Sequence, residues 1–266
     1  MEMEEAKRKY QELVGSIGEM ERVAVAYSGG ADSTLLLKAA LDSSAEVTAF
    51  MATGEMFFHD EQTLALDLAE SMGVDIVTLK LDLVNDAQFA RNWEDRCHVC
   101  KSVMFAEIKG MARDLDISNV LEGSHIDDLK EIRPGRAALV DLGIRSPLVD
   151  ARLTKAEVRA LLKDMGLPNW DLPSNTCLAT RVPYDVRITS QILKRVARAE
   201  AALAPYGFKN LRVRDHEHWA RVEVAPEDVP RLFQERESVI KALKGLGYRR
   251  VAMDLEGYGG LRRPNQ

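Results

Sequence analysis

Over the first part of the chain, short apolar runs alternate with stretches whose apolar residues recur at helical spacing. The runs are rich in Val, Ile and Leu, are typical of buried strands, and lie at 22–27, 46–52, 74–80 and 118–122. The stretches with helical spacing lie at 32–41, 59–72 and 101–115. Because strands that alternate with helices pair in parallel and are covered on both faces, this pattern predicts a Rossmann-like α/β domain with a parallel sheet.

A further helix is predicted over 154–165 by the signals at its two ends. Thr154 is followed three residues later by Glu157, as in a capping box, and the helical spacing stops at Gly166, shortly before a proline. We therefore expect the domain boundary at this point. The two expected domains are 1–167 and 168–266.

The second expected domain has a different order of elements. It opens with a loop at 168–177, because that segment is rich in Pro, Asn, Asp and Ser. A helix, two strands, a helix and a last strand are then predicted at 189–204, 211–215, 219–224, 227–243 and 248–255. This order predicts a small α+β domain with a mostly antiparallel sheet.

Composition and charge limit the classes of partner that the chain is expected to bind. The chain has 266 residues, of which 46% are hydrophobic, and a formal net charge of -6. This apolar content is enough for a packed core, and the acidic balance argues against holding long nucleic acid by bulk electrostatics. No apolar run approaches the length of a membrane span, and the segment 1–7 is acidic where a secretory signal would be basic. We expect no membrane partner and a cytoplasmic location.

One hexapeptide carries the strongest chemical signal, namely Ser28-Gly29-Gly30-Ala31-Asp32-Ser33 between a predicted strand and a predicted helix. Adjacent glycines let the backbone approach an anion, and the first N–H groups of a helix lack intrahelical partners. The segment therefore predicts a cradle for a polyphosphate. It does not have the spacing of the P-loop or of the dinucleotide-binding glycine motif. An ordinary glycine-rich turn with serine caps is the simpler alternative.

Three cysteines form the second signal. Cys97 and Cys100 are separated by two residues, and Cys177 lies far along the chain. Thiolates at this spacing can point at one metal centre, and three of them suit a 4Fe-4S cluster with one open iron. Structural zinc needs a fourth protein ligand, such as His125. A redox disulfide between the first two cysteines, or three unrelated buried thiols, are the remaining alternatives.

A pair of arginines suggests a phosphate clamp. Arg212 and Arg214 alternate along a predicted strand and so share one face, where Glu223 on the next strand can hold one of them in place. The simpler alternative is a solvated strand face with an exposed ion pair. Further arginines expected to contribute to substrate binding are Arg181, Arg133 and Arg136.

These features together resemble one known family. The hexapeptide resembles the PP-loop of the ATP pyrophosphatases, which adenylate a substrate and release pyrophosphate. Within that superfamily the chain resembles, over nearly its whole length, the LarE family of ATP-dependent sulfur transferases. The segments that carry the resemblance are the hexapeptide, Arg133-Pro134-Gly135-Arg136, Asn169-Trp170-Asp171 leading to Cys177, Arg181-Val182-Pro183-Tyr184 and Arg212-Val213-Arg214.

The resemblance implies an activity. The family adenylates a carboxylate of pyridinium-3,5-biscarboxylic acid mononucleotide and converts it to a thiocarboxylate, in biosynthesis of the nickel-pincer nucleotide of lactate racemase. A nucleotide phosphate of this substrate is what the arginines are expected to bind. Asp32 is the carboxylate expected to help hold Mg²⁺, and Asp32 and Ser33 are expected to serve adenylation. ATP contacts are expected from Ala26, Ser28, Gly29, Gly30, Asp32, Ser33 and Met51.

The family has two branches that differ in the sulfur donor. In one branch a cysteine matching Cys177 gives up its own sulfur and becomes dehydroalanine. In the other branch, cysteines matching Cys97, Cys100 and Cys177 hold a 4Fe-4S cluster whose open iron carries a labile sulfide. The presence of Cys97 and Cys100 therefore favours the second branch and implies an external sulfide source. The resemblance also implies a homo-oligomer, a hexamer built from trimers.

Rival functions share some of these features. A tRNA-thiolating enzyme also combines a PP-loop with a CxxC pair, but the acidic charge and the lack of a recognisable RNA-binding module argue against it. An amidating ligase of the NAD- or GMP-synthetase kind shares the loop and has no need of three cysteines. A cluster-binding sensor or scaffold would have no use for the intact nucleotide loop.

Overall fold

The structure is a computed structural model that describes residues 2–130, 134–172 and 176–258. Its contacts divide the chain into two compact units, which are described separately. Unit one contains 1–54, 59–81 and 97–174, apart from residues outside the described ranges. Unit two contains 55–58, 82–96 and 175–266, with the same exception.

Unit one is built on a four-stranded sheet with the strand order β3-β2-β1-β4, in which all pairings are parallel. Its strands are β1 (Arg22–Ala26), β2 (Glu46–Thr53), β3 (Ile76–Lys80) and β4 (Asn119–Leu121). The α/β class with a parallel Rossmann-like sheet is thereby confirmed. Each strand lies where the apolar runs of the sequence predict one.

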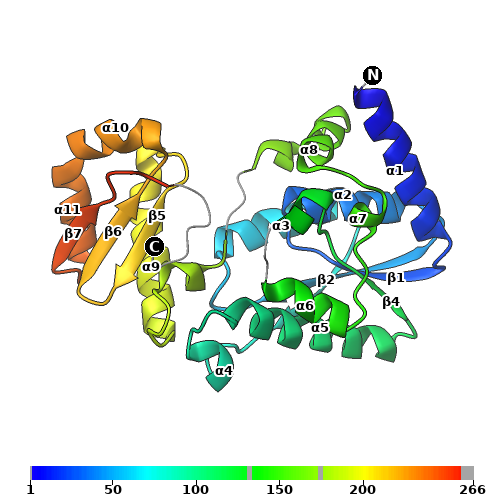
Figure 1. Cartoon of the computed structure of the whole chain (residues 1–266), viewed down its shortest axis with the longest axis horizontal. Coiled ribbons are helices and arrows are strands. Elements are labelled where there is room, and N and C mark those ends of the chain that lie inside the picture. The colour runs from blue at the N-terminus through cyan, green and yellow to red at the C-terminus, as the bar shows by residue number, and fades with distance from the viewer. Residues whose placement is uncertain (1, 131–133, 173–175, 259–266) are drawn as a thin grey trace. The chain divides into compact units, whose positions relative to one another are not determined.

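Helices cover both faces of this sheet (Figure 1). One face packs in a continuous core against α1, α2 and α8, while α5 and α6 lie on the other face. The helices of unit one are α1 (Glu2–Gly18), α2 (Ala31–Asp42), α3 (His59–Ser71), α5 (Arg96–Asp114), α6 (Pro134–Asp141), α7 (Pro147–Asp150), α8 (Lys155–Asp164) and the 3-10 helices η1 (Ile126–Lys130) and η2 (Pro168–Asp171).

The ends of two helices matter for the site. α8 begins with the predicted capping box, since the N–H of Glu157 donates to Thr154 Oγ1 at 3.2 Å and the N–H of Thr154 donates to Glu157 Oε2 at 2.8 Å. The helix predicted to begin at residue 101 in fact begins at Arg96. It begins earlier because Arg96 is buried and its guanidinium is hydrogen bonded, which anchors one more turn. That additional turn contains Cys97 and Cys100.

Unit two has a three-stranded sheet with the order β5-β6-β7. Its elements are α4 (Ala87–Ala90), η3 (Leu178–Arg181), α9 (Ser190–Leu203), η4 (Ala204–Tyr206), β5 (Arg212–His216), β6 (Trp219–Glu223), η5 (Pro226–Asp228), α10 (Val229–Gln234), α11 (Arg236–Gly245) and β7 (Arg250–Met253). The α+β class is confirmed, and α9 and α11 contribute to a core on this sheet.

Two local expectations for unit two are wrong. The sheet is mixed, because β5 and β6 pair antiparallel while β6 and β7 pair in parallel. A helical connection between two strands lets them run in the same direction, and α10 and α11 form such a connection. The single helix expected at 227–243 is two helices, since the backbone of Glu235 leaves the helical conformation with ψ near 7°.

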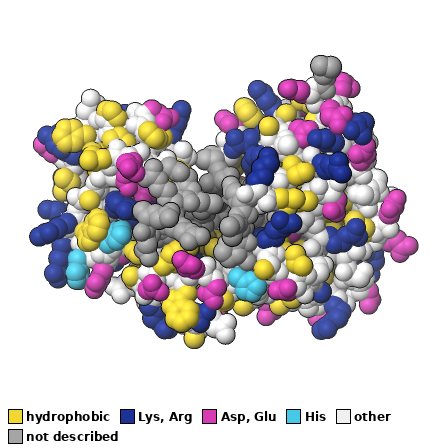
Figure 2. Space-filling model, viewed as in Figure 1, with side chains coloured by type: hydrophobic (Ala, Val, Ile, Leu, Met, Phe, Trp, Pro, Cys, Tyr) yellow, Lys and Arg dark blue, Asp and Glu magenta, His cyan; other side chains and the backbone are white. Residues whose placement is uncertain are grey.

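The surface carries both signs of charge. On the face drawn in Figure 2, Lys and Arg side chains are interspersed with Asp and Glu over both units. Among the described residues, none of the helices is both long and apolar enough for a membrane span.

Candidate active site

The phosphate loop of unit one is shaped by Gly29. This residue has a φ of +76°, and a Cβ atom built on it would lie 2.3 Å from the Cβ of Ala65 in α3. The hydroxyl of Tyr27 donates to the backbone carbonyl of Ala65 at 3.1 Å, which holds α3 in this position. Only glycine satisfies both the left-handed backbone and the close approach of the helix.

The serines of the loop are bonded to each other. Ser33 Oγ accepts from the N–H of Ser28 at 3.2 Å, lies 3.1 Å from Ser28 Oγ, and donates to the carbonyl of Gly30 at 3.1 Å. Gly30, the N-cap of α2, provides no side chain to cap the helix, and the loop's Ser28 and Gly30 are exposed. The first N–H groups of α2 therefore have no side-chain cap, and they adjoin the exposed Ser28 and Gly30, an arrangement that suits an anion.

Asp32 lies in the first turn of α2 and forms an ion pair that the sequence did not predict. Lys155 Nζ donates to Asp32 Oδ2 at 2.6 Å, and His125 Nε2 lies 3.9 Å from Asp32 Oδ1. That Oδ1 atom is buried without a hydrogen-bond partner in the described part of the chain. Buried carboxylate oxygens normally have a partner, and a bound ion or water at Oδ1 would provide one.

The segment after β4 also reaches the loop, and sequence reasoning missed it. A Cβ atom on Gly123 would lie 2.9 Å from the backbone nitrogen of Ser33, so this segment lies directly against the loop. Glu122 is buried and accepts hydrogen bonds from Ser124 Oγ at 2.8 Å and from Ser146 Oγ at 2.5 Å. The position of this segment at the carboxyl end of β4 could have indicated its place in the site, because ligands of parallel sheets bind at the carboxyl ends of the strands.

The residues expected to contact adenosine have different surroundings. Ala26 is the last residue of β1, as expected from the end of its apolar run. Met51 lies inside β2, two residues before the end of the strand, and is 2% exposed. Their contacts with ATP remain predictions.

The first two cysteines share one turn of α5 in unit one. Cys97 is exposed and Cys100 is half-buried, and residues three apart lie on the same helix face. Gly135 lies against this turn, because a Cβ atom built on it would lie 3.2 Å from the carbonyl oxygen of Cys97 and 2.8 Å from the Cδ atom of Lys101. No disulfide joins any of the three cysteines, all of which belong to the described residues.

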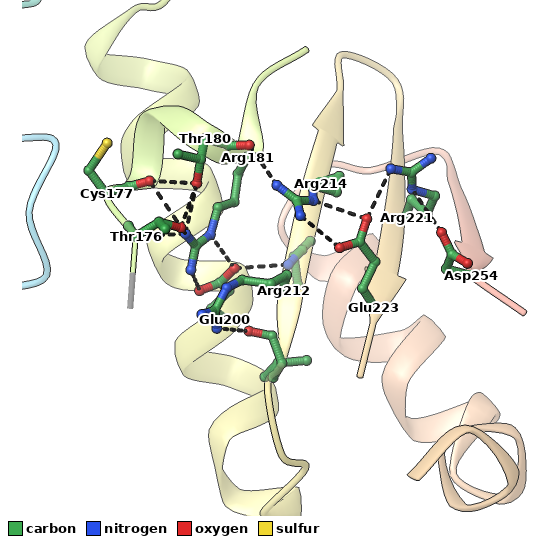
Figure 3. Close-up of polar contacts among 12 residues, drawn as sticks. Thr176, Cys177, Thr180, Arg181, Glu200, Arg212, Arg214, Arg221, Glu223 and Asp254 are labelled. Atoms are coloured by element: carbon green, nitrogen blue, oxygen red, sulfur yellow. Dashed lines mark hydrogen bonds and ion pairs between the residues drawn. The ribbon is translucent and has the colours of Figure 1, made fainter. Parts of the chain in front are cut away.

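Cys177 lies in unit two, at the N-cap of η3, on a turn held by hydrogen bonds (Figure 3). The carbonyl of Cys177 accepts from Thr180 Oγ1 at 2.8 Å and from Arg181 Nη1 at 3.3 Å. The next residue, Leu178, donates its N–H to the carbonyl of Met56 at 2.9 Å. Over the described ranges, no group of three or more His, Cys, Asp or Glu side chains is arranged to hold a metal ion.

Arg181 is a fully buried ion-pair residue. Its side chain is 0% exposed and forms two hydrogen bonds with the carboxylate of Glu200, at 2.9 and 3.0 Å. It also donates to the carbonyl and hydroxyl of Thr176, at 2.7 and 2.8 Å. These contacts fix the turn that carries Cys177, and the expected contact between Arg181 and a substrate remains a prediction.

Arg214 and Glu223 form a paired clamp on one sheet face. Arg214 donates to both carboxylate oxygens of Glu223, at 3.0 and 2.8 Å, and also to the carbonyl of Thr180 at 2.7 Å. Arg221 donates to the same carboxylate at 2.9 Å. Burial raises the pKa of Glu223, but the hydrogen bonds and charges of the two arginines outweigh it and hold this pKa below its ordinary value.

The other expected arginines differ in exposure. Arg212 is 6% exposed and shares the sheet face of Arg214. Its guanidinium carbon lies 5.1 Å from the ring centre of Tyr258. Burial, and then the charge of Arg181, lower the pKa of the Arg212 guanidinium. Arg136 is an exposed residue of α6, and Arg133 lies outside the described residues.

Comparisons with known proteins include a relative with a named activity. The chain is 34% identical over 248 residues to the pyridinium-3,5-bisthiocarboxylic acid mononucleotide synthase of Lactiplantibacillus plantarum, covering 92% of this chain and 90% of that protein. Uncharacterized proteins of Synechocystis and Methanocaldococcus jannaschii are 34% and 28% identical over 253 and 239 residues, which are 94% and 90% of this chain. A search of family models finds no match.

Proposed function

The chain is an enzyme of the LarE family, to which the synthase of Lactiplantibacillus plantarum belongs, and on this basis we propose that it inserts sulfur into pyridinium-3,5-biscarboxylic acid mononucleotide. The observation that carries the proposal is the 34% identity to that synthase over 92% of the chain. The proposed reaction consumes ATP, releases AMP and pyrophosphate, and converts a carboxylate to a thiocarboxylate.

The chemistry needs ATP because a carboxylate is a poor electrophile. In the first step a carboxylate oxygen of the substrate attacks the α-phosphorus of ATP, and the bond to pyrophosphate breaks. In the second step sulfide attacks the acyl carbon, and AMP leaves with the electron pair of the former acyl–oxygen bond. The products are then the thiocarboxylate, AMP and pyrophosphate.

The loop of unit one is assigned to the phosphates of ATP. The uncapped N–H groups at the start of α2 and the hydroxyls of Ser28 and Ser33 would bind the β- and γ-phosphates. Asp32 would share Mg²⁺ with the phosphates, since this ion is usually held by one or two carboxylates, substrate oxygens and water. Its buried Oδ1 atom, which has no partner among the described residues, supports this role. In the absence of Mg²⁺, the ammonium group of Lys155 balances the negative charge of Asp32.

The basic sheet face of unit two is assigned to the phosphate of the substrate. Arg212 and Arg214 offer guanidinium groups, which match a phosphate dianion with paired hydrogen bonds. Glu223 keeps Arg214 extended toward Thr180 and so pre-orders it at low entropic cost. Arg181 is assigned to hold the Cys177 turn, and the exposed Arg136 is assigned as a further contact of the substrate.

The three thiols are assigned to a 4Fe-4S cluster. The donor set fits the group, since thiolates are its usual ligands and Cys97 and Cys100 lie on one face of a helical turn. Cys177 would be the third ligand, and the cluster, when bound, would supply a labile sulfide at its open iron. The turn around Cys177 supports this role because hydrogen bonds to the carbonyl of Cys177 hold its backbone in place.

The proposal is tested by turnover of the purified chain under anaerobic conditions. Mg·ATP, sulfide and pyridinium-3,5-biscarboxylic acid mononucleotide should give a thiocarboxylate product by mass spectrometry, together with AMP and pyrophosphate. Amide formation with ammonia in place of sulfide, or thiolation of tRNA without any change in the mononucleotide, would contradict it. The expected hexameric assembly and cytoplasmic location belong to the same proposal, and light scattering tests the assembly.

A further inference from the structure

Asn169 is a buried polar residue to which the proposed reaction assigns no role. It lies in η2, is 4% exposed, and belongs to unit one. Its Nδ2 group donates to the carbonyl of Gly29 at 2.9 Å and to Thr34 Oγ1 at 2.7 Å. A segment separated from Gly29 by 140 positions in sequence is thus hydrogen bonded to the backbone of the phosphate loop.

The bond to Gly29 sets the orientation of a single peptide plane. The peptide between Gly29 and Gly30 is trans, since the described chain has no cis peptide bonds, so its carbonyl and its N–H point in opposite directions. Asn169 lies on the buried side, where its amide nitrogen donates to the carbonyl of Gly29. The N–H of Gly30 is therefore directed to the other side of the plane, and Gly30 itself is exposed.

Without the hydrogen bond from Asn169, the peptide plane between Gly29 and Gly30 could rotate easily. Two successive glycines have wide backbone freedom, and Gly29 already adopts a φ of +76°. A rotation of the plane would present a carbonyl oxygen, in place of an N–H, to any anion on the exposed side. Such a replacement changes an attraction for phosphate into a repulsion.

The two polar atoms of the Asn169 side chain differ in their hydrogen bonding. Both contacts use its amide nitrogen, whereas its Oδ1 atom is buried with no partner in the described ranges. An unsatisfied buried acceptor costs stability, so the arrangement is poorly explained by stability alone. The arrangement is explained if the amide nitrogen of Asn169 is needed to hold the backbone of the phosphate loop.

We propose that Asn169 is a positioning residue that aims the N–H of Gly30 at the pyrophosphate portion of ATP. The inference rests on the proposed ATP use of the loop, but not on the identity of the acceptor substrate. It assigns to Asn169 an effect on phosphate binding and none on the adenosine portion. Thr34, the second partner, then has a structural role only.

Two variants separate these roles. Asn169→Leu keeps the approximate shape, adds no charge and removes both donors. Thr34→Val keeps the Gly29 bond and removes only the second partner, and so serves as the matched control. Binding of Mg·pyrophosphate and of AMP to each folded variant is measured separately by calorimetry, with melting curves recorded in the absence of ligand.

The expected result is a loss of about tenfold in pyrophosphate affinity for Asn169→Leu, the size of one hydrogen bond to a charged group. AMP affinity should stay within about twofold, and Thr34→Val should match the unmodified protein for both ligands. Unchanged pyrophosphate binding in Asn169→Leu overturns the proposal. Equal losses for pyrophosphate and AMP, or equal losses in the two variants, also overturn it, because they indicate a general structural role.

A measurement on the unmodified protein covers the case in which Asn169→Leu does not fold. Hydrogen exchange of peptides covering 28–34 and 168–171 is followed with Mg·pyrophosphate and with AMP. Pyrophosphate should slow exchange in both segments together, since the Asn169 bond links them, and AMP should not. Protection of 28–34 with no change in 168–171 would overturn the inference. Turnover of the mononucleotide is not needed, so failure of the proposed reaction is a separate outcome.

Discussion

Arg96 Nη1 donates a hydrogen bond of 3.0 Å to the carbonyl of Ala179, and both residues belong to unit two. Arg96 directly precedes Cys97, and Ala179 follows Cys177 by two positions. The same guanidinium is hydrogen bonded to Asn92 Oδ1 and is buried. Within unit two, the bond therefore joins two segments that are 83 positions apart in the sequence.

The first prediction concerns this bond. Arg96→Met should lower the free energy of unfolding by about 3 kcal/mol, because it removes a buried charged donor and leaves its acceptors unpaired. If the cysteines hold a cluster, the variant should also retain less iron after anaerobic reconstitution. Arg91→Met is the matched control, since Arg91 pairs with Asp95 at the surface and is 34% exposed. Equal iron content in both variants would count against the role of Arg96.

The second prediction separates the two sources of sulfur. If Cys177 is a cluster ligand, the intact mass of the chain should be unchanged after turnover with added sulfide. Cys97→Ser and Cys100→Ser should each lose iron and the visible absorption of the cluster. Dehydroalanine at position 177, formed in step with product, would instead identify Cys177 as the consumed donor.

The third prediction concerns adenylation. If the loop binds Mg·ATP as proposed, Asp32→Ala and Ser33→Ala should each reduce substrate-dependent pyrophosphate release by about 100-fold, because they would remove a ligand for Mg²⁺ and a hydroxyl beside the phosphates. Lys38→Met is the control on the same helix, where Lys38 pairs with Asp42. The cluster content should be unchanged in all three variants. Normal pyrophosphate release by both loop variants would refute the assignment of the loop.

The fourth prediction compares the two loop glycines. Gly29→Ala should destabilise the fold by more than about 2 kcal/mol, because the left-handed backbone disfavours a Cβ and Ala65 lies only 2.3 Å from where it would be. Gly30→Ala should melt close to the unmodified protein, since its φ is −71° and the nearest atom is 3.5 Å away. Calorimetric melting curves provide the comparison, and similar melting of the two variants would contradict it.

The fifth prediction is a pH dependence. The pKa of Glu223 is lowered in the folded state, so its ion pairs stabilise the fold above the ordinary Glu pKa of 4.5 and this contribution is lost as the pH falls through the lowered value. Glu223→Gln should cost about 3 kcal/mol at pH 7, as for a broken buried pair, and less at low pH. Urea unfolding at several pH values measures this difference.

A surface pair provides the control for that experiment. Glu46 also has a lowered pKa, caused first by its hydrogen bond with Arg22, but this pair is exposed. Glu46→Gln should therefore change the unfolding free energy little at any pH. A Glu223→Gln difference that stays constant as the pH falls would show that the carboxylate charge is not what stabilises the fold.

Local signals in the sequence predicted much of the architecture. Apolar runs located all four strands of the parallel sheet, and the spacing of Thr154 and Glu157 predicted a capping box that the structure contains. The hexapeptide at 28–33 lies at the expected turn from β1 into α2. Such features depend on residues only a few positions apart, whose geometry is largely fixed by backbone and side-chain chemistry.

Long-range partners were decided only by the tertiary structure. The pair of Lys155 with Asp32, and the bond from Asn169 to Gly29, join positions separated by 123 and 140 in sequence. Arg181 is expected from the sequence to contribute to substrate binding, and only the structure shows that its side chain is fully buried against Glu200. Neither periodicity nor a motif specifies such contacts, because they arise from how whole elements pack and from the need to pair every charge that packing buries.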